Sequence, residues 1–383
     1  MFLALRELKH SKTRYMLISL IMVLIAWLVL FVSGLAKGLS SDNASSIQNM
    51  NADYLVVDQN SDHRLNRSVI TEDMLTQVGR AAEKSGGLEA APLGVQMSSV
   101  TQAGSPKKID ATFFAIEADG MLAPEITEGR MIGDTAADEV VADSSFKDEH
   151  GLKLGDVIED QISDRSFKIV GFTDGQSFSH APVLHMNFTG WKTITADSRP
   201  TVAEGAVDGD ADSAGVAFNA IALKAAGSAA KSIGDQVDGI EVVTKAEALK
   251  GIPGYKEEQG SLLMMIAFLF IIAAFVLAVF FYVITIQKMN QFGVLKAIGA
   301  KTGFLARSLL FQVLSLSIFS LAIGIALTYG VSFILPDSMP FELNLKLVGG
   351  SSLLFLAVAV IGSLLSLLRV AKVDAMEAIG RAA

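Results

Sequence analysis

The sequence predicts an α-helical membrane protein with four transmembrane helices plus an α+β extracellular domain inserted between helices 1 and 2. Hydrophobic residues make up 51% of the 383 residues, and the mean hydropathy is +0.45, which is high for a soluble domain. The apolar residues gather in four uncharged runs at residues 16–36, 261–286, 308–335 and 347–368. Each run is at or above the roughly 20 residues that a helix needs to cross a bilayer.

The distribution of charge predicts how these runs are oriented. The flanking segments 1–15, 287–307 and 369–383 are basic, whereas residues 37–260 carry 16 more acidic than basic residues. Positively charged loops stay on the cytoplasmic side of a membrane. We therefore expect a multi-pass protein of the cell membrane with both termini and the loop 287–307 in the cytoplasm. The large domain 37–260 and the short loop 336–346 would then lie outside the cell.

The N-terminal segment allows two interpretations. Residues 1–15 mix apolar and charged side chains in the manner of an amphipathic helix on the inner membrane surface. The run 16–36 follows this basic flank and ends in small residues, as a cleaved signal peptide does. We favour a membrane anchor because its 21 residues exceed the apolar core of a signal peptide, which has about 7–15.

Residues 37–260 alternate strand and helix signals, which is typical of an α+β domain. Runs rich in β-branched and aromatic residues predict strands at 52–58, 111–117, 139–142, 166–172, 183–187 and 215–223. Helices are predicted at 71–84 and 228–237. Residues 196–214 contain few apolar residues and several turn formers, so we interpret them as an excursion without secondary structure.

The residue types that are absent exclude several functions. The chain has no cysteine, which excludes disulfides, thiolate catalysis, cysteine-ligated metals and covalent heme attachment. It also lacks the motifs of P-loop nucleotide binding, zinc proteases and serine hydrolases. We predict that the chain is no enzyme and has no intrinsic cofactor. Any ATP would be bound and hydrolysed by a separate partner chain.

The predicted cytoplasmic loop 287–307 carries an apolar stripe. Phe292, Val294, Leu295 and Ile298 follow each other at helical spacing beside several lysines. Such a stripe, if exposed, either docks on a partner protein or rests on lipid headgroups, where each lysine contributes about 1 kcal/mol. The spacing alone leaves both interpretations open.

The same loop carries a resemblance to a known family. Residues 292–300 read FGVLKAIGA and resemble the coupling segment of ABC-transporter permeases of the MacB/FtsX type, which docks on an ATPase subunit. The tail at 371–379 and the order of one span, a large exterior domain and three spans are also similar to this family. The resemblance implies two copies of an ABC ATPase subunit as partners. It assigns the contact with that ATPase to Phe292, Gly293, Val294, Leu295, Lys296, Ile298 and Gly299.

A narrower resemblance involves residues 28–39, 167–173 and 179–184, which are similar to the corresponding stretches of bacterial hemin-exporter permeases. It implies a homodimer of permeases, so that the partners are a second copy of the chain, the ATPase subunits and membrane lipid, with no nucleic acid. The substrate would be heme that has partitioned into the membrane. Heme would leave from a lateral site in the outer leaflet, so that no continuous pore is needed.

Heme is a flat apolar macrocycle with two carboxylates and an iron that takes axial ligands, and several suitable side chains stand near the outer ends of the first two spans. The candidate heme-binding residues are Glu257, Glu258, Met264, Met265, Phe268, Phe31 and Lys37, with Met22 deeper. In a two-fold dimer, facing copies of Glu257 or Glu258 would flank one heme and ligate its iron. Alternatively, the two glutamates only mark the headgroup boundary, and the methionines face lipid or pack.

Other polar and small residues have simpler interpretations. His10 is expected in the cytoplasm, and His63, His150, His180 and His185 in the middle of the exterior domain, with surface or structural roles. The pair Gly34 and Gly38 permits close helix approach, with a slight preference for a dimer contact. Small residues at 320, 324 and 328 form a similar ridge on the third span, and Gln312 should bond a neighbouring helix.

Two functions therefore compete. The first is the permease subunit of an ABC-type efflux pump that exports heme or hemin and is driven by a separate ATPase. The alternative is a MacB/FtsX-type mechanotransmitter that acts on an extracellular partner, such as a cell-wall hydrolase or a lipoprotein, without heme transport. A membrane-anchored enzyme or sensor is disfavoured because catalytic motifs and signalling domains are absent from the sequence.

Overall fold

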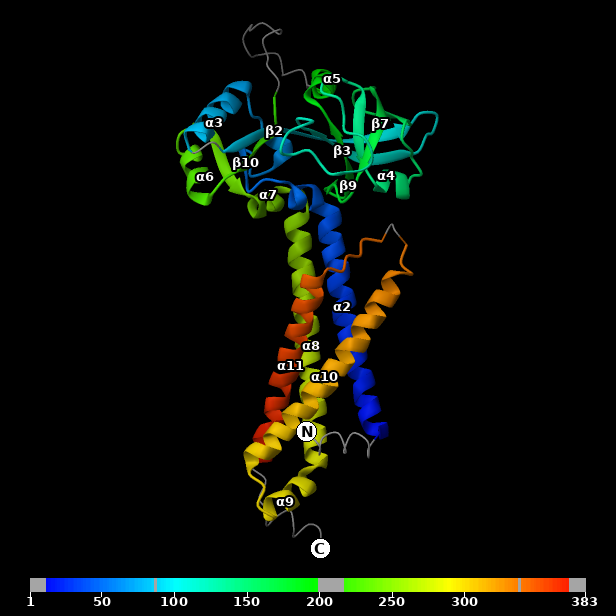
Figure 1. Ribbon diagram of the computed structural model, residues 1–383, viewed down its shortest axis with the longest axis vertical. Coiled ribbons are helices and arrows are strands. Elements are labelled where there is room, and N and C mark those ends of the chain that lie inside the picture. Colours follow the sequence, from blue (N-terminus) through cyan, green and yellow to red (C-terminus); the bar gives the residue numbers. More distant parts are fainter. Residues whose placement is uncertain (1–11, 86–87, 199–216, 337–338, 372–383) are drawn as a thin grey trace. The chain divides into compact units, whose positions relative to one another are not determined.

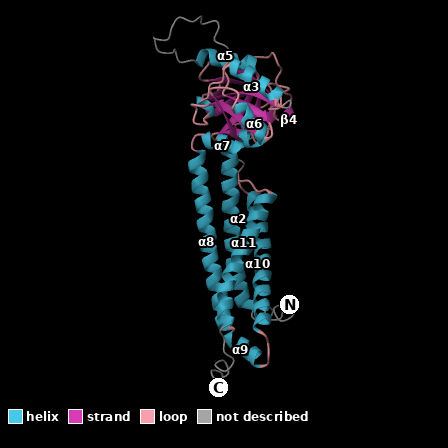
Figure 2. Ribbon diagram, turned by 90° about the vertical axis from the view of Figure 1, so that its left-hand side faces the viewer, coloured by secondary structure: helices cyan, strands magenta, loops and turns pink. Residues whose placement is uncertain are grey.

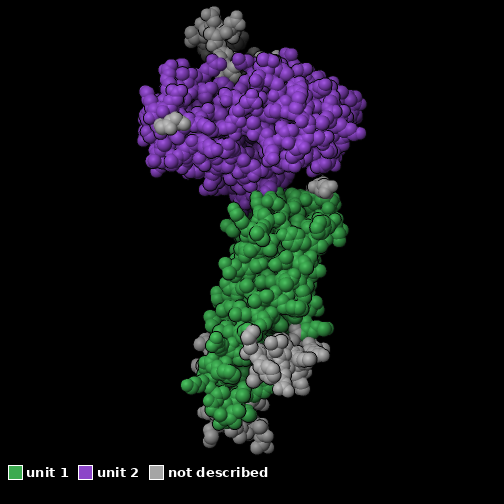
Figure 3. All heavy atoms as spheres, in the orientation of Figure 1, with its two compact units in different colours: residues 1–38, 260–383 green, residues 39–259 purple. Residues whose placement is uncertain are grey.

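The computed structural model describes residues 12–85, 88–198, 217–336 and 339–371. The chain divides into two compact units, one of residues 1–38 and 260–383 and the other of residues 39–259 (Figure 3). The amphipathic segment up to residue 11 and the tail from residue 372 lie outside the described residues. The first unit is helical, and the second is an α+β domain.

Four helices are long and apolar enough to cross a membrane (Figure 1). They are α2 (Lys12–Asn49), α8 (Tyr255–Gln287), α10 (Thr302–Ser332) and α11 (Leu345–Ala371), with the short α9 (Met289–Ala297) between α8 and α10. Helix α2 continues past the uncharged run 16–36, and α8 begins before the run 261–286. Polar residues next to an apolar span can belong to the same helix. The last residues of α2 and the first of α8 belong to the α+β unit.

The helical unit is held together by an apolar core with small residues at the helix crossings. Met22 of α2, Phe281 of α8 and Phe355 of α11 are almost wholly buried in this core. A Cβ atom on Gly324 of α10 would lie 3.1 Å from the Cβ of Ala26 in α2, so the predicted small-residue ridge on α10 does allow close approach. Figure 2 shows the four long helices running along one another.

A buried polar contact joins the turn before α9 to α10. The Lys288 Nζ donates a hydrogen bond of 3.0 Å to the Oε1 of Gln312, and both side chains are buried. Lys288 is the residue before α9, and Gln312 lies within α10. Gln312 was expected to bond a neighbouring helix, and its partner instead lies in the turn between α8 and α9.

The α+β unit is built on an eleven-stranded mixed sheet with the order β11-β1-β10-β2-β3-β9-β5-β7-β4, to which β6 and β8 attach at the side. The strands are β1 (Tyr54–Asp58), β2 (Glu89–Gln102), β3 (Lys108–Ala115), β4 (Ile126–Gly129), β5 (Glu139–Asp143), β6 (Val157–Asp160), β7 (Ser166–Thr173), β8 (Ser177–Phe178), β9 (Ala181–Met186), β10 (Ala220–Lys224) and β11 (Ile240–Thr244). The helical elements are η1 (Leu65–Arg67), α3 (Glu72–Lys84), α4 (Ser145–Asp148), α5 (Phe188–Ser198), α6 (Gly227–Gly234) and α7 (Lys245–Gly251).

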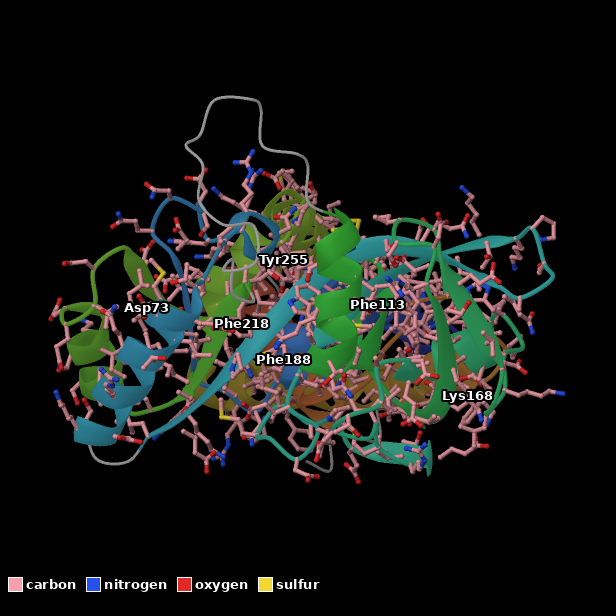
Figure 4. The ribbon with its side chains drawn as sticks, turned by 90° about the horizontal axis from the view of Figure 1, so that it is seen from above. Asp73, Phe113, Lys168, Phe188, Phe218 and Tyr255 are labelled. Carbon is pink, nitrogen blue, oxygen red and sulfur yellow. The ribbon has the colours of Figure 1, made fainter. Side chains whose placement is uncertain are left out.

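The long strand β2 joins two halves of this unit. Its first residues pair with β10, where Leu93 lies opposite Ala220, and its last residues pair with β3, where Val100 lies opposite Ile109. Figure 4 shows Asp73 of α3 and Lys168 of β7 on opposite sides of Phe188 and Phe218. These two phenylalanine rings meet edge to face with their centroids 5.2 Å apart.

Most predicted elements of this unit are present with shifted ends, including the helix α3, whose N-cap Thr71 accepts a hydrogen bond from the Met74 amide. Strand β2 was not predicted, because Pro92 and Gly94 interrupt its apolar pattern. The predicted excursion at 196–214 begins too early, since α5 continues to Ser198. Residues 199–216 lie outside the described part of the chain.

Candidate functional site

Within the α+β unit, one histidine joins the end of α2 to the start of α8. The His180 Nδ1 lies 2.7 Å from the Oδ2 of Asp42, and its Nε2 lies 3.0 Å from the Oε2 of Glu258. The same Glu258 oxygen accepts a hydrogen bond of 2.7 Å from the Asn43 side chain. Burial disfavours the charged imidazole, but the two carboxylates outweigh it and raise the pKa of His180 above its usual value.

The backbone of the β8–β9 hairpin places His180 there. Ser179 and His180 form the two-residue turn with φ values of 54° and 61°, as the tight turns that match the twist of a hairpin require. The Ser179 amide donates a hydrogen bond of 2.7 Å to the carbonyl of Asn43 in α2. The turn is thus fixed to the helix by main chain as well as by side chain.

Helix α2 is interrupted where this hairpin attaches. Ala44 has non-helical angles (φ −150°, ψ 17°), and the hydroxyls of the two serines that follow bond the hairpin instead of their own helix. The Ser177 amide donates to the Ser45 hydroxyl at 2.9 Å, and the Ser46 hydroxyl donates to the Ser177 carbonyl at 2.8 Å. Inserted polar contacts of this kind are a recognised cause of helix kinks.

The structure places the two candidate glutamates differently. Glu258 is half-buried among Asn43 and His180, and its second oxygen, Oε1, is buried without a partner among the described residues. Glu257, one position earlier in the first turn of α8, is exposed. The sequence analysis expected only a surface or structural role for His180 and missed its contact with Glu258. No sequence signal could find it, because 78 residues separate the two.

The other candidate heme residues are in the helical unit and have different surroundings. Met264, Met265 and Phe268 of α8 are 58%, 42% and 57% exposed. Met22 is fully buried in the helical core. The remaining two contact the segment before α11: the Phe31 ring lies 5.3 Å from the Phe341 ring, and the Lys37 Nζ lies 3.6 Å from the Glu342 carboxylate. These six residues thus have three kinds of surroundings: exposed on α8, buried in the helical core, or in contact with the segment before α11.

The same segment before α11 also covers the glycine pair of α2. A Cβ atom on Gly34 would lie 2.7 Å from the Phe341 ring, and one on Gly38 would lie 2.3 Å from the Pro340 carbonyl. The Glu342 amide donates a hydrogen bond of 3.1 Å to the Gly34 carbonyl. The preference for a dimer contact at Gly34 and Gly38 is therefore wrong in this structure, because a segment of the same chain occupies their face.

The predicted coupling segment forms α9 and the turn that follows it. Phe292 is buried and packs with Leu305 at the start of α10, and Leu295 is half-buried against the same cluster. Val294 and Ile298, which are four residues apart, are 53% and 77% exposed. The expectation of one exposed stripe is thus half wrong, because α10 covers two of its four members. Gly299 ends the segment with a φ of +97°, a conformation that glycine adopts without strain.

The remaining histidines have structural surroundings, with His10 outside the described residues. The His63 Nε2 lies 3.1 Å from the Glu241 carboxylate. Burial and the nearby Lys107 lower the pKa of His150, and complete burial lowers the pKa of His185 to about 3. Within the described residues, no group of three or more histidine, cysteine, aspartate or glutamate side chains has the arrangement of a metal site.

Comparisons with known proteins agree with this architecture. A family model described as MacB-like periplasmic core domain matches residues 16–239, and one described as FtsX-like permease C-terminal matches residues 263–375. The "Putative hemin transport system permease protein HrtB" of Staphylococcus haemolyticus is 32% identical over 384 residues, and its namesake in Staphylococcus epidermidis is 28% identical over 380.

A further relative is an uncharacterized ABC transporter permease of Mycobacterium tuberculosis, 24% identical over 386 residues. In all three relatives the match covers 99% of both chains. The similarity thus extends over the α+β unit and the helical unit alike. The chain belongs to the MacB/FtsX family of ABC-transporter permeases, membrane proteins with a large extracellular domain.

Proposed function

We propose that the chain is the permease subunit of an ABC-type efflux pump that exports heme or hemin from the membrane and is driven by a separate ATPase subunit. The observation that carries this proposal is the full-length similarity, at 32% identity, to a protein named as a hemin transport permease. In this proposal two copies of the chain and two ATPase subunits form the pump. Both termini and α9 lie in the cytoplasm, in accordance with the positive-inside rule.

The exposed face of α8 supports a lateral site for an apolar substrate. Only 17% of the most apolar stretch of α8 is buried, compared with 44% for α2 and for α10. Met264, Phe268 and Phe275 are spaced along one side of the helix, and each is more than half exposed. Aromatic and thioether side chains on a helix that faces lipid offer a flat apolar surface. A porphyrin could lie on this surface, between α8 and a second copy of the chain.

The iron ligand in this proposal is Glu257 or Glu258, and Glu257 is the more exposed of the two. The Oε2 of Glu258 accepts a hydrogen bond from the Asn43 side chain and lies 3.0 Å from the His180 Nε2. These contacts would have to break before this oxygen could bind iron. Glu257 is exposed in the first turn of the same helix. The heme-binding roles of Glu257, Glu258, Met264, Met265 and Phe268 are part of this proposal. Those of Phe31, Lys37 and Met22 require the segment before α11 or the helical core to rearrange.

The proposal is tested by hemin binding to the purified permease. We expect a saturable shift of the Soret band with the wild type and a weaker, non-saturable signal with Glu257→Ala. The matched control is Glu83→Gln, which alters an exposed carboxylate on α3 and should bind as the wild type does. If the wild type shows no saturable band, the mechanotransmitter hypothesis replaces heme export. If Glu257→Ala binds normally while the wild type is saturable, only the ligand assignment is wrong.

A further inference from the structure

A cavity of about 530 Å³ lies in the α+β unit, and none of the residues proposed to bind heme lines it. Its floor is one face of the sheet, with Phe114 and Ile116 from β3 and the residue after it, and His185 from β9. The end of α2 and the segment 121–125 form its walls, where Met121 contributes a half-buried side chain. This volume is within the range of pockets that hold small molecules, about 300–1,000 Å³.

The His185 side chain lines the floor of the cavity and makes no hydrogen bond to the described residues. His185 is 2% exposed, and its Nδ1 is buried with no hydrogen-bond partner among the described residues. The ring packs edge to face on Phe114, with 6.0 Å between the centroids. Buried polar groups are nearly always hydrogen-bonded, and an exception calls for an explanation. A polar group of a bound molecule would give the His185 ring a hydrogen-bond partner in the cavity.

The charge of the lining indicates what kind of molecule this is. Glu125 and Asp174 line the cavity, and both are exposed. Among the described residues that line it, none is lysine or arginine. Other polar lining groups are already bonded within the protein: Thr173 donates to the Glu125 carbonyl at 2.8 Å, and Thr127 donates to the Phe172 carbonyl at 3.1 Å. Asp174 also interacts electrostatically with the Lys147 ammonium, which lies outside the lining. The lining itself is nevertheless negatively charged, which favours a cation.

We propose that this cavity binds a small organic cation, a protonated amine with an apolar body and one hydrogen-bonding group. The amine lies at the rim between Glu125 and Asp174, the body rests on Phe114, Ile116 and Met121, and the polar group reaches His185. Heme itself does not suit the cavity, because its two carboxylates would face Glu125 and Asp174 with no lysine or arginine among the described lining residues. The lining residues of this site are therefore different from the residues proposed to bind heme.

The test uses dansylcadaverine, a primary amine that is joined by a short chain to an aromatic sulfonamide whose fluorescence rises in apolar surroundings. The full chain is titrated in lipid nanodiscs, and empty nanodiscs give the background from lipid. We expect saturable binding of dansylcadaverine and at least about tenfold weaker binding of its N-acetyl derivative, which has the same body without the charge. Glu125→Gln together with Asp174→Asn should weaken binding of the amine to the same extent.

Matched variants separate the site from general effects. Glu83→Gln with Asp238→Asn removes two exposed carboxylates of the same unit that do not line the cavity, and it should bind as the wild type does. His185→Leu should weaken binding about fivefold, as loss of one hydrogen bond does, without lowering the unfolding temperature. The proposal is overturned if the amine and its acetyl derivative bind alike, or if the double variant at the rim keeps wild-type affinity. Displacement of the amine by hemin would likewise overturn the assignment to a cation.

Discussion

At the scale of single residues, His180 is the clearest case of a position whose role comes from tertiary structure. Its imidazole connects Asp42 of α2 with Glu258 of α8, and the left-handed turn that carries it is held by the Asn43 carbonyl. Neither the spacing of the residues nor any motif in the sequence indicates this contact. Candidate ligands in spans could be predicted from composition, whereas partners that lie far apart in the chain could not.

The His180 contacts predict that stability depends on pH. Folding raises the pKa of His180. The contribution of its ion pairs to the free energy of unfolding is therefore complete below the pKa of the unfolded protein, near 6.5. It is lost as the pH rises through the pKa of the folded protein. The His180 side chain is 43% exposed, so solvent screening limits the effect to at most about 1 kcal/mol. The apparent unfolding temperature of the wild type should fall more between about pH 6 and about pH 9 than that of His180→Gln. Equal pH profiles for the two proteins would contradict this.

At the scale of elements, the apolar residues of α9 and of the turn after it differ in exposure because α10 covers only some of them. The sequence places four apolar residues at helical spacing but does not show which of them the protein itself covers. Leu305 at the start of α10 packs with Phe292 and Leu295, which leaves Val294 and Ile298 as the exposed pair. The helix and its apolar character were predictable from periodicity. Which side faced outward depended on α10.

The exposed pair is the better place to test docking of an ATPase. Ile298→Asp puts a charge on a side chain that is 77% exposed, so it should abolish copurification of the ATPase while membrane insertion and unfolding temperature stay unchanged. A charge at Leu295 would also disturb the packing on Leu305 and is less informative. Gln291→Asp adds the same charge at an exposed polar position of α9 and serves as the control. Copurification of Ile298→Asp at wild-type yield would refute docking through this pair.

At the scale of the whole molecule, the four spans were predictable, because an uncharged apolar run of roughly 20 residues or more is typical of a transmembrane helix. The ends of the helices were not, since α2 and α8 continue through polar residues. The glycines of α2 were correctly interpreted as positions of close approach, but the sequence could not identify what approaches them. In the helical unit it is the segment 340–343, which contacts Gly34 and Gly38.

The contact of the segment 340–343 with α2 predicts that a larger side chain at Gly38 destabilises the protein, whereas one at Gly330 does not. Gly38→Leu should lower the apparent unfolding temperature by several degrees, because a Cβ atom there would lie 2.3 Å from the Pro340 carbonyl and backbone must move. Gly330→Leu is the matched control, since nothing lies within 4 Å of a Cβ atom at Gly330 in α10. It should be neutral or slightly stabilising, because glycine within a helix costs roughly 0.5–1 kcal/mol. Equal unfolding temperatures for the two variants would argue against the contact.

Strand β2 has a consequence for how the α+β unit responds to strain. Its first residues are hydrogen-bonded to β10 in one half of the sheet, and its later residues to β3 in the other half. Neither half can therefore unfold without breaking the pairing of β2 in the other half. A force applied to either half acts on the same fourteen-residue strand. We therefore expect the two halves to unfold together in a single step.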